Sequence, residues 1–115
     1  MKPRILNVSL DESLRTTRER LLQDAGYSVV SASSWIEFEQ ACAGYSFDLI
    51  LLGQTLPPSL KHDMADHVQN HCPDVKLAEI YLHGASVPAK YSFHAAGTDA
   101  SDFLKFVDAT LAEKK

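Results

Sequence analysis

Cysteine is scarce in this 115-residue sequence, in which Cys42 and Cys72 are the only two. Neither belongs to a C-x-x-C pair, so the sequence predicts neither a disulfide framework nor a zinc knuckle. We expect both thiols to be buried as small apolar side chains, which is the usual setting of a free cysteine.

Long apolar runs and an excess of positive charge are also missing. The longest apolar run covers only residues 49–52, which is far too short to cross a bilayer, and no signal-peptide core follows the first four residues. The net charge of −4 argues against binding to a nucleic-acid backbone, because such proteins present a basic patch. We therefore expect a cytoplasmic protein that has neither nucleic acid nor a membrane as its partner.

The motifs of common catalytic and nucleotide sites are absent as well. The sequence VSLDESL, residues 8–14, provides no glycine-rich loop that would hold a phosphate group, and no G-x-S-x-G nucleophile elbow occurs in the chain. No cysteine and histidine have a convincing setting for nucleophilic catalysis. The sequence predicts neither an enzyme nor a bound cofactor.

What the sequence does contain is a regular alternation of short apolar runs with longer amphipathic windows. This alternation is typical of β-α units stacked around a parallel sheet, and the length suits one domain over residues 1–115. The apolar run at 49–52 indicates a central strand covered on both faces, and Ser34 with Glu37 matches the capping box that opens a helix. The expected strands cover residues 4–9, 27–32, 47–52, 77–83 and 91–95, and the expected helices cover residues 11–25, 34–44, 59–71 and 99–113.

One connection is too short for this pattern. Only seven residues, 84–90, lie between the fourth and fifth expected strands, whereas a parallel connection normally takes a dozen or more and includes a helix. Seven extended residues still span roughly 23 Å, enough to return along a strand of about 17 Å. We expect an extended crossover and a parallel fifth strand, with a reversed fifth strand as the alternative.

Several local motifs together resemble the receiver domain of bacterial two-component response regulators. They are D-L-I-L-L-G-Q-T-L-P at 48–57, D-E-S-L-R at 11–15, A-G-Y at 25–27 and P-D-V at 73–75. The resemblance covers nearly the whole chain. It implies an α/β fold of the flavodoxin-like, doubly wound type with strand order 2-1-3-4-5, here with the fourth helix missing or replaced by a short loop.

The same resemblance places the phosphorylation site of such domains at the end of the third and first strands. The phospho-accepting aspartate falls on Gly53, and the two magnesium-binding acids fall on Ser9 and Leu10, with Asp11 one place later. Phosphoryl transfer to a receiver needs a carboxylate nucleophile and a metal ion that neutralises the phosphate. Gly53 provides no nucleophile.

The two remaining positions of that site also depart from the family pattern. The switch threonine or serine corresponds to His83, and the lysine that covers the new acyl phosphate corresponds to Ala95 or Ala96. None of the usual active-site set is therefore present. The chain resembles a degenerate receiver, or pseudo-receiver, in which the architecture has been kept without its chemistry.

The first functional hypothesis is a stand-alone, phosphorylation-independent signalling module that binds a partner protein or a second copy of itself. An edge strand with little helical cover would present Tyr91 and Phe93 as a partner surface. The alternative is that these rings simply pack on the last helix. A further alternative is that the chain is one subunit of a split system whose output domain or kinase is encoded elsewhere.

The runner-up hypothesis is a small-molecule or metal sensor at the carboxyl edge of the sheet, where doubly wound folds hold their ligands. His83 and His94 together with Asp11 would supply ligands for a transition metal. Alternatively each histidine is an ordinary hydrogen-bonded residue or a pH-sensitive contact. The residues of this candidate rim are Ser9, Asp11, Gly53, His83 and His94.

A second histidine set recurs along the third expected helix. Asp63, His67 and His71 are spaced by four and so share one helix face. Metal capture by the two histidines is geometrically possible, and a solvated helix face is the commoner explanation of such a pattern.

Overall fold

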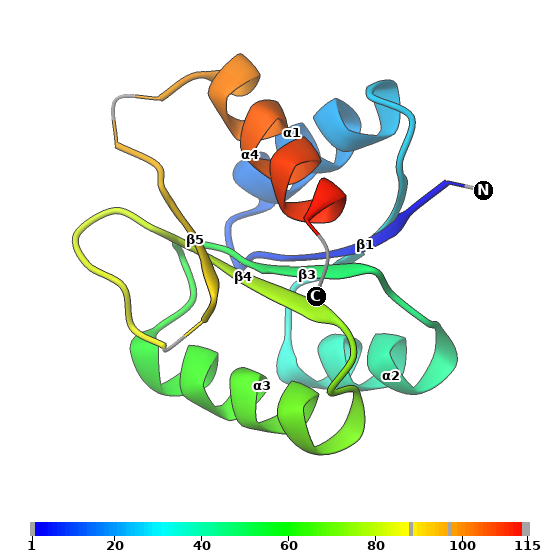
Figure 1. Ribbon diagram of the computed structural model, residues 1–115. Coiled ribbons are helices and arrows are strands. Elements are labelled where there is room, and N and C mark those ends of the chain that lie inside the picture. The colour runs from blue at the N-terminus through cyan, green and yellow to red at the C-terminus, as the bar shows by residue number, and fades with distance from the viewer. Residues whose placement is uncertain (1, 88, 97, 114–115) are drawn as a thin grey trace.

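A five-stranded parallel sheet forms the centre of the computed structural model, which describes residues 2–87, 89–96 and 98–113 (Figure 1). The strands lie in the order β2-β1-β3-β4-β5, as the doubly wound prediction requires. β5 pairs in parallel with β4, with Tyr91 opposite Ala78, so the parallel prediction for the fifth strand is confirmed. The strands are β1 (Arg4–Val8), β2 (Ser28–Ala32), β3 (Leu49–Leu52), β4 (Lys76–Tyr81) and β5 (Tyr91–His94).

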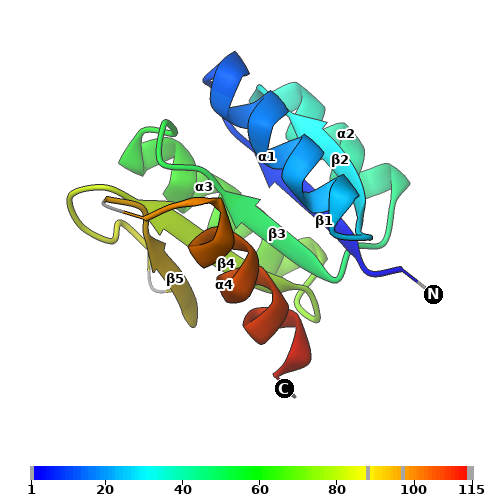
Figure 2. The ribbon, with the colours of Figure 1, turned by 90° about the horizontal axis from the view of Figure 1, so that it is seen from above.

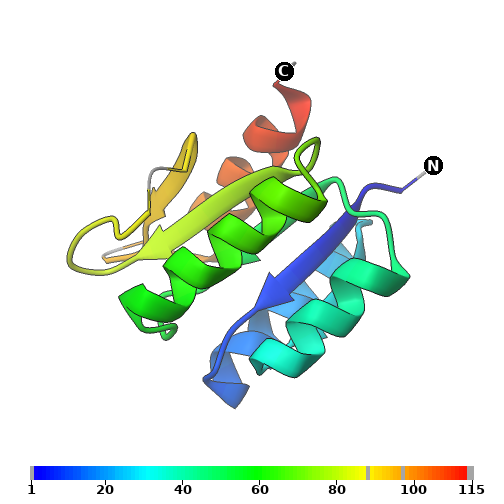
Figure 3. The same cartoon turned by 90° about the horizontal axis from the view of Figure 1, so that it is seen from below.

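Four helices cover the two faces of this sheet. They are α1 (Glu12–Asp24), α2 (Trp35–Gly44), α3 (Pro58–His71) and α4 (Ala100–Ala112). Figure 2 shows α1 and α4 side by side on one face, and Figure 3 shows α2 and α3 on the other. Among the described residues, no helix is long and apolar enough to span a membrane.

Side-chain caps fix where these helices begin. The Asp11 carboxylate accepts a 2.8 Å hydrogen bond from the Leu14 amide at the start of α1, and such a cap typically stabilises a helix by about 1 kcal/mol. Ser34 caps α2 as predicted, but the expected capping box is not formed. The Glu37 carboxylate instead accepts hydrogen bonds from the amide and hydroxyl of Ser33, one residue earlier, both at 2.7 Å.

The central strand β3 separates two apolar clusters. Leu49 and Leu51 face α1 and α4, whereas Ile50 and Leu52 face α2 and α3, and none of the four is exposed to solvent. This strand is therefore covered on both faces, as its uninterrupted apolar sequence predicts. Truncation of one of these side chains to alanine typically costs about 2–5 kcal/mol in such a setting.

The segment between β4 and β5 forms no helix in its described residues, 82–87 and 89–90. It is held instead by Glu79 of β4, whose carboxylate accepts hydrogen bonds from the backbone amides of Ser86 and Val87 at 2.9 and 3.1 Å. The Val87 side chain is 7% exposed and so covers part of the sheet. An extended loop, anchored on the buried Glu79 carboxylate, thus connects β4 to β5 where the receiver resemblance would place a further helix.

The two cysteines are less buried than the sequence analysis expects. Both are half-buried and pack at the margin of the cluster beneath α2 and α3. Partial burial raises the pKa of Cys42 to about 12, and the neighbouring Cys72 thiol adds to this shift. Cys42 lies near the end of α2 and Cys72 lies directly after α3, both at the margin of that cluster.

Candidate functional site

The carboxyl ends of β1 and β3 lie next to each other at the point where the strand order reverses. Ser9 follows β1 directly and Gly53 follows β3 directly, so both sit at the edge of the sheet where doubly wound folds bind ligands. Ser9 is fully buried, and its amide donates to the carbonyl of Ala32 at 3.1 Å. The backbone therefore places Ser9 and Gly53 at this edge, and the use of the edge as a ligand-binding rim stays a prediction.

Gly53 packs closely against the backbone of β1. Its amide donates to the Val8 carbonyl at 2.8 Å, and a Cβ atom added at position 53 would lie 2.7 Å from that same oxygen. Side-chain carbons do not approach a backbone oxygen so closely. With the backbone in this position, there is neither a carboxylate at this point of the rim nor space for one.

The hydroxyl of Thr55 fills the space between the two strand ends. Its Oγ1 lies 3.2 Å from the Ser9 hydroxyl, with which it shares a hydrogen bond, and it accepts from the amides of Leu10 and Asp11 at 3.1 and 3.4 Å. The turn after β3 is thus tied to the loop after β1 by neutral groups. Sequence analysis did not single out Thr55, because a threonine in a turn carries no signal of what it will contact across the sheet.

Asp11 has a structural use in this arrangement. It is the N-cap of α1, and its side chain is exposed at the start of the helix. The Leu10 side chain is 43% exposed and contributes no ligand atoms. The loop after β1 therefore presents a single carboxylate, and that carboxylate already accepts a hydrogen bond from the helix backbone.

The two histidines of the candidate rim, His83 and His94, lie on elements other than the ends of β1 and β3. His83 is exposed in the loop after β4, since β4 ends at Tyr81 rather than at residue 83. The His94 ring stacks on the ring of Tyr81, with centroids 5.0 Å apart and planes 6° from parallel. Its Nε2 donates to the Leu82 carbonyl at 2.7 Å, so His94 has the setting of an ordinary hydrogen-bonded residue.

No metal centre is assembled from the candidate ligands. Within residues 2–87, 89–96 and 98–113, no group of three or more histidine, cysteine or acidic side chains is placed to hold a metal ion. His67 and His71 do lie together on α3, with ring centroids 4.4 Å apart. The His67 ring is half-buried and makes an edge contact with Trp35, which makes it part of the packing between α3 and α2.

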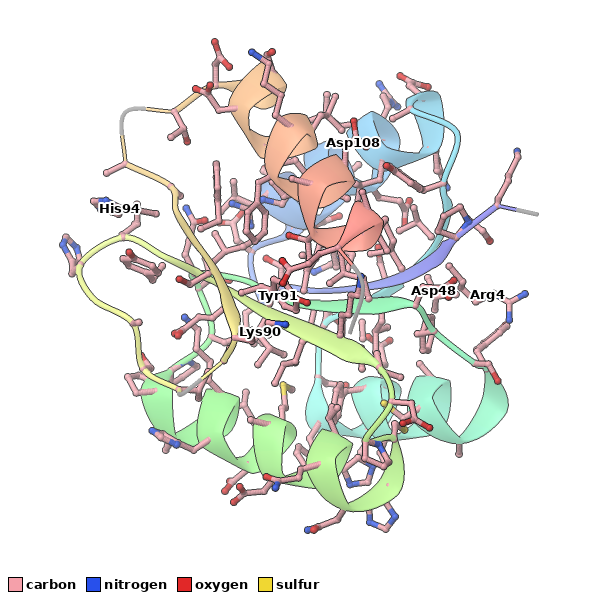
Figure 4. The ribbon with its side chains drawn as sticks, viewed as in Figure 1. Arg4, Asp48, Lys90, Tyr91, His94 and Asp108 are labelled. Atoms are coloured by element: carbon pink, nitrogen blue, oxygen red, sulfur yellow. The ribbon has the colours of Figure 1, made fainter. Side chains whose placement is uncertain are left out.

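The two aromatic residues proposed as a partner surface point beneath α4. The Tyr91 side chain is buried, and the Phe93 ring lies 5.1 Å from the ring of Phe106 and 6.1 Å from that of Phe103. Both rings therefore pack against the last helix, as the alternative in the sequence analysis expects, and their contact with a partner protein stays a prediction. Figure 4 shows Tyr91 pointing toward the body of the protein and His94 pointing outward from the same strand.

The two residues that follow β5 directly, Ala95 and Ala96, carry no charge. Ala95 is half-buried and Ala96 is exposed, and the Ala95 carbonyl accepts from the Thr98 hydroxyl at 2.7 Å. No cation therefore stands at the end of β5 among the described residues 91–96, where the resemblance places a lysine.

Comparison with solved structures agrees with the observed architecture, whereas comparison by sequence finds no relative. A scan against protein-family models finds no match, and a search of curated proteins finds none either. Among solved structures, the chain is similar to the non-phosphorylated HemR receiver domain from Leptospira biflexa, with a TM-score of 0.84, 24% identity and coverage of 99% of this chain and 98% of that one. It is also similar to a response regulator from Thermotoga maritima, with a TM-score of 0.85, 15% identity and coverage of 98% and 100%.

The chain has the fold of a receiver domain. A third similar structure is the response regulator TrrA from Thermotoga maritima in complex with Mg²⁺-BeF, with a TM-score of 0.78, 24% identity and coverage of 96% of this chain and 99% of that one. Structural similarity at such low sequence identity shows the fold alone, and the chemistry of the site has to be read from this chain's own residues.

Proposed function

We propose that this chain is a receiver-like signalling module that acts without phosphorylation, by binding a partner protein or a second copy of itself. The observation that carries the proposal is the contact of Gly53 with the Val8 carbonyl, at the place where a receiver-type nucleophile would stand. A neutral Ser9–Thr55 contact occupies the same edge. Metal-assisted phosphoryl transfer needs a carboxylate and a bound cation there, and neutral hydroxyl and amide groups supply neither.

The edge strand β5 is the surface that we assign to partner binding. α4 covers one face of β5, whereas Ser92 and His94 on the other face are exposed, and the nearby Leu82 side chain is 39% exposed. The described residues between β4 and β5, 82–87 and 89–90, form no helix that would cover this face. Exposed edge strands with little cover are common sites for pairing with a strand of another chain.

Backbone direction indicates which groups of β5 are available for such pairing. The Ala95 amide donates to the Tyr81 carbonyl at 2.8 Å, so residues 91, 93 and 95 direct their backbone groups toward β4. Because successive residues alternate, Ser92 and His94 direct theirs away from the sheet. A partner strand would therefore hydrogen bond to Ser92 and His94.

Phosphorylation independence is tested with the intact protein in Mg²⁺ and acetyl phosphate, followed by intact mass, and in Mg²⁺ with beryllofluoride, followed by thermal melting. We expect no phosphate-mass adduct and no Mg²⁺-dependent beryllofluoride shift. An adduct, or a melting shift that requires both ions, would show that another carboxylate accepts the phosphoryl group and would end this part of the proposal.

The partner surface is tested with Ser92→Pro and its matched control Ser92→Ala. Proline removes the outward N–H of an edge strand without taking a hydrogen bond from β4, and alanine keeps that N–H. We expect that any self-association seen by analytical ultracentrifugation, or any protein retained by the immobilised chain, persists with Ser92→Ala and is lost with Ser92→Pro. Equal behaviour of the two variants would exclude the β5 edge.

A further inference from the structure

A small cavity lies at the carboxyl edge of the sheet, on the face covered by α1 and α4. Its volume is about 250 Å³. Apolar side chains from α1, β5 and α4 make most of its wall, and Arg18 and Gln54 add polar groups; the lining includes Leu14, Leu21, Phe93 and Phe103. It adjoins the rim described above but uses neither Ser9 nor the two histidines.

Arg18 is the unusual member of this wall. Its side chain is only 8% exposed, and its guanidinium carbon lies 5.6 Å from the centre of the Phe103 ring. Nη2 donates to the side-chain oxygen of Gln54. Nη1 is closed to solvent and has no hydrogen-bond partner among the described residues, which is rare for a buried polar atom.

The charge of Arg18 also lacks a carboxylate partner within the described part of the chain. The ion pairs there are Lys61 with Glu79 and Lys90 with Glu113. Asp99 lines the same cavity, but its carboxylate accepts from the Asp102 amide at 3.0 Å as the cap of α4. Burial lowers the pKa of Arg18, yet a guanidinium keeps its charge at any physiological pH, so the cavity wall holds a cation that no described carboxylate contacts at ion-pair distance.

We propose that this cavity binds a small organic anion that carries one carboxylate and an apolar body. The carboxylate takes the place of the Gln54 amide on Nη2 of Arg18, and its second oxygen pairs with Nη1, which becomes accessible when the Gln54 side chain moves aside. A planar guanidinium matches a carboxylate in two such parallel hydrogen bonds. The apolar body lies against Leu14, Leu21 and Phe93. A volume below the usual range of drug-sized pockets, roughly 300–1,000 Å³, limits the ligand to a small molecule.

The test uses benzoate as a probe of this class, with benzamide as its neutral counterpart and inorganic phosphate as an anion without an apolar body. Binding to the full chain is followed by amide chemical shifts. The variant is Arg18→Met, and the matched control is Arg20→Met, which removes an exposed arginine from the same helix. We expect benzoate to bind the wild type and Arg20→Met alike, and to bind Arg18→Met at least about tenfold more weakly.

We also expect benzamide and phosphate to bind the wild type at least about tenfold more weakly than benzoate. Benzamide lacks the carboxylate, and phosphate lacks the apolar body. The proposal is overturned by the absence of shifts at millimolar benzoate, by equal binding of benzamide, by equal binding of phosphate, or by equal binding to Arg18→Met. If Arg18→Met does not fold, Arg18→Lys serves instead, since it keeps a charge but loses the planar fork. Unchanged benzoate affinity in Arg18→Lys would then contradict the two-point carboxylate contact.

This site is independent of the proposed partner surface. Benzoate binding involves Arg18 and leaves the outward groups of Ser92 and His94 free, so the Ser92→Pro variant should bind benzoate as the wild type does. Either proposal can therefore fail while the other stands.

Discussion

The ammonium group of Lys61 on α3 lies 2.8 Å from the carboxylate of Glu79 on β4, and both side chains are almost fully buried. The same ammonium donates to the Ile80 carbonyl at 3.0 Å. On its other side, the Glu79 carboxylate accepts from the Ser86 and Val87 amides. One buried ion pair therefore joins α3, the sheet and the loop that replaces a helix.

Removal of one partner of this pair should be strongly destabilising. Glu79→Gln leaves the Lys61 ammonium buried without a counter-charge, and breaking such a pair typically costs about 3–5 kcal/mol. We expect a loss of this size in urea unfolding, together with faster hydrogen exchange of the Ser86 and Val87 amides. The double variant Lys61→Met with Glu79→Gln should be less destabilised than Glu79→Gln alone, because it removes the unpaired charge; a double variant that is worse would contradict this account.

The same pair predicts how stability depends on acid. Burial by itself would raise the pKa of Glu79, but the hydrogen bonds from Lys61, Ser86 and Val87 outweigh it and lower the pKa below its ordinary value. The unfolded chain then takes up a proton at higher pH than the folded one, so this contribution is complete above the ordinary glutamate pKa of about 4.3 and is lost as pH falls below it. The stability difference between the wild type and Glu79→Gln, measured by urea unfolding, should shrink as the pH is lowered from about 6 to about 3. A difference that stays constant over this range would contradict the lowered pKa of Glu79.

Much of this fold could be predicted because its signals are local. The apolar run at 49–52 marks a strand buried on both faces, and the short spacing of residues 84–90 leaves no room for a helix. The Lys61–Glu79 pair could not be predicted, because its members are 18 positions apart and look like any two solvated charges. Only the packing of α3 against β4 makes them a buried pair.

The candidate rim was predictable in part for the same reason. Ser9 and Gly53 follow apolar strands, so their place at the carboxyl edge follows from the strand ends. The expected end of the fourth strand at His83 was wrong, because pairing with the short strand β5 ends at Tyr81, although the apolar sequence continues to Leu82. Thr55 and Arg18 were missed, since their roles depend on contacts across the sheet and not on their neighbours in sequence.

Tyr27 provides a prediction for alkaline solution. Its hydroxyl donates to the carboxylate of Asp108 on α4, which Figure 4 labels. Partial burial raises the pKa of Tyr27 to about 12, and the hydrogen bond to Asp108 and its negative charge add to the shift. The unfolded chain loses this proton near pH 10, so the contribution is complete below about pH 10 and is lost as pH rises toward the folded pKa.

The measurement is urea unfolding of the wild type and Tyr27→Phe between about pH 9 and 12. The stability advantage of the wild type should fall across this range. A wild-type advantage that does not change with pH would show that the hydroxyl of Tyr27 titrates alike in both states.

Gly53 is a position at which one added methyl group should disturb the contact between β1 and the turn after β3. In Gly53→Ala the new methyl group meets the Val8 carbonyl at 2.7 Å, and relief of this clash requires β1 and the turn after β3 to move apart. Overpacking of this kind typically costs about 1–3 kcal/mol. Gly44→Ala is the matched control, since no atom lies within 4 Å of a Cβ built there.

Introducing a carboxylate with Gly53→Asp carries the same steric cost and adds a charge beside the neutral Ser9–Thr55 contact. Ser9 and Leu10 provide no acids to bind the metal, so we expect Gly53→Asp to be destabilised in urea unfolding and to gain no phosphate from acetyl phosphate in Mg²⁺ by intact mass. If Gly53→Asp is as stable as the wild type and becomes phosphorylated, the edge is a receiver site lacking only its nucleophile. If it is destabilised and stays unmodified, the backbone contact between β1 and the turn after β3 leaves no space for the carboxylate, and adding this one group does not make the edge a phosphorylation site.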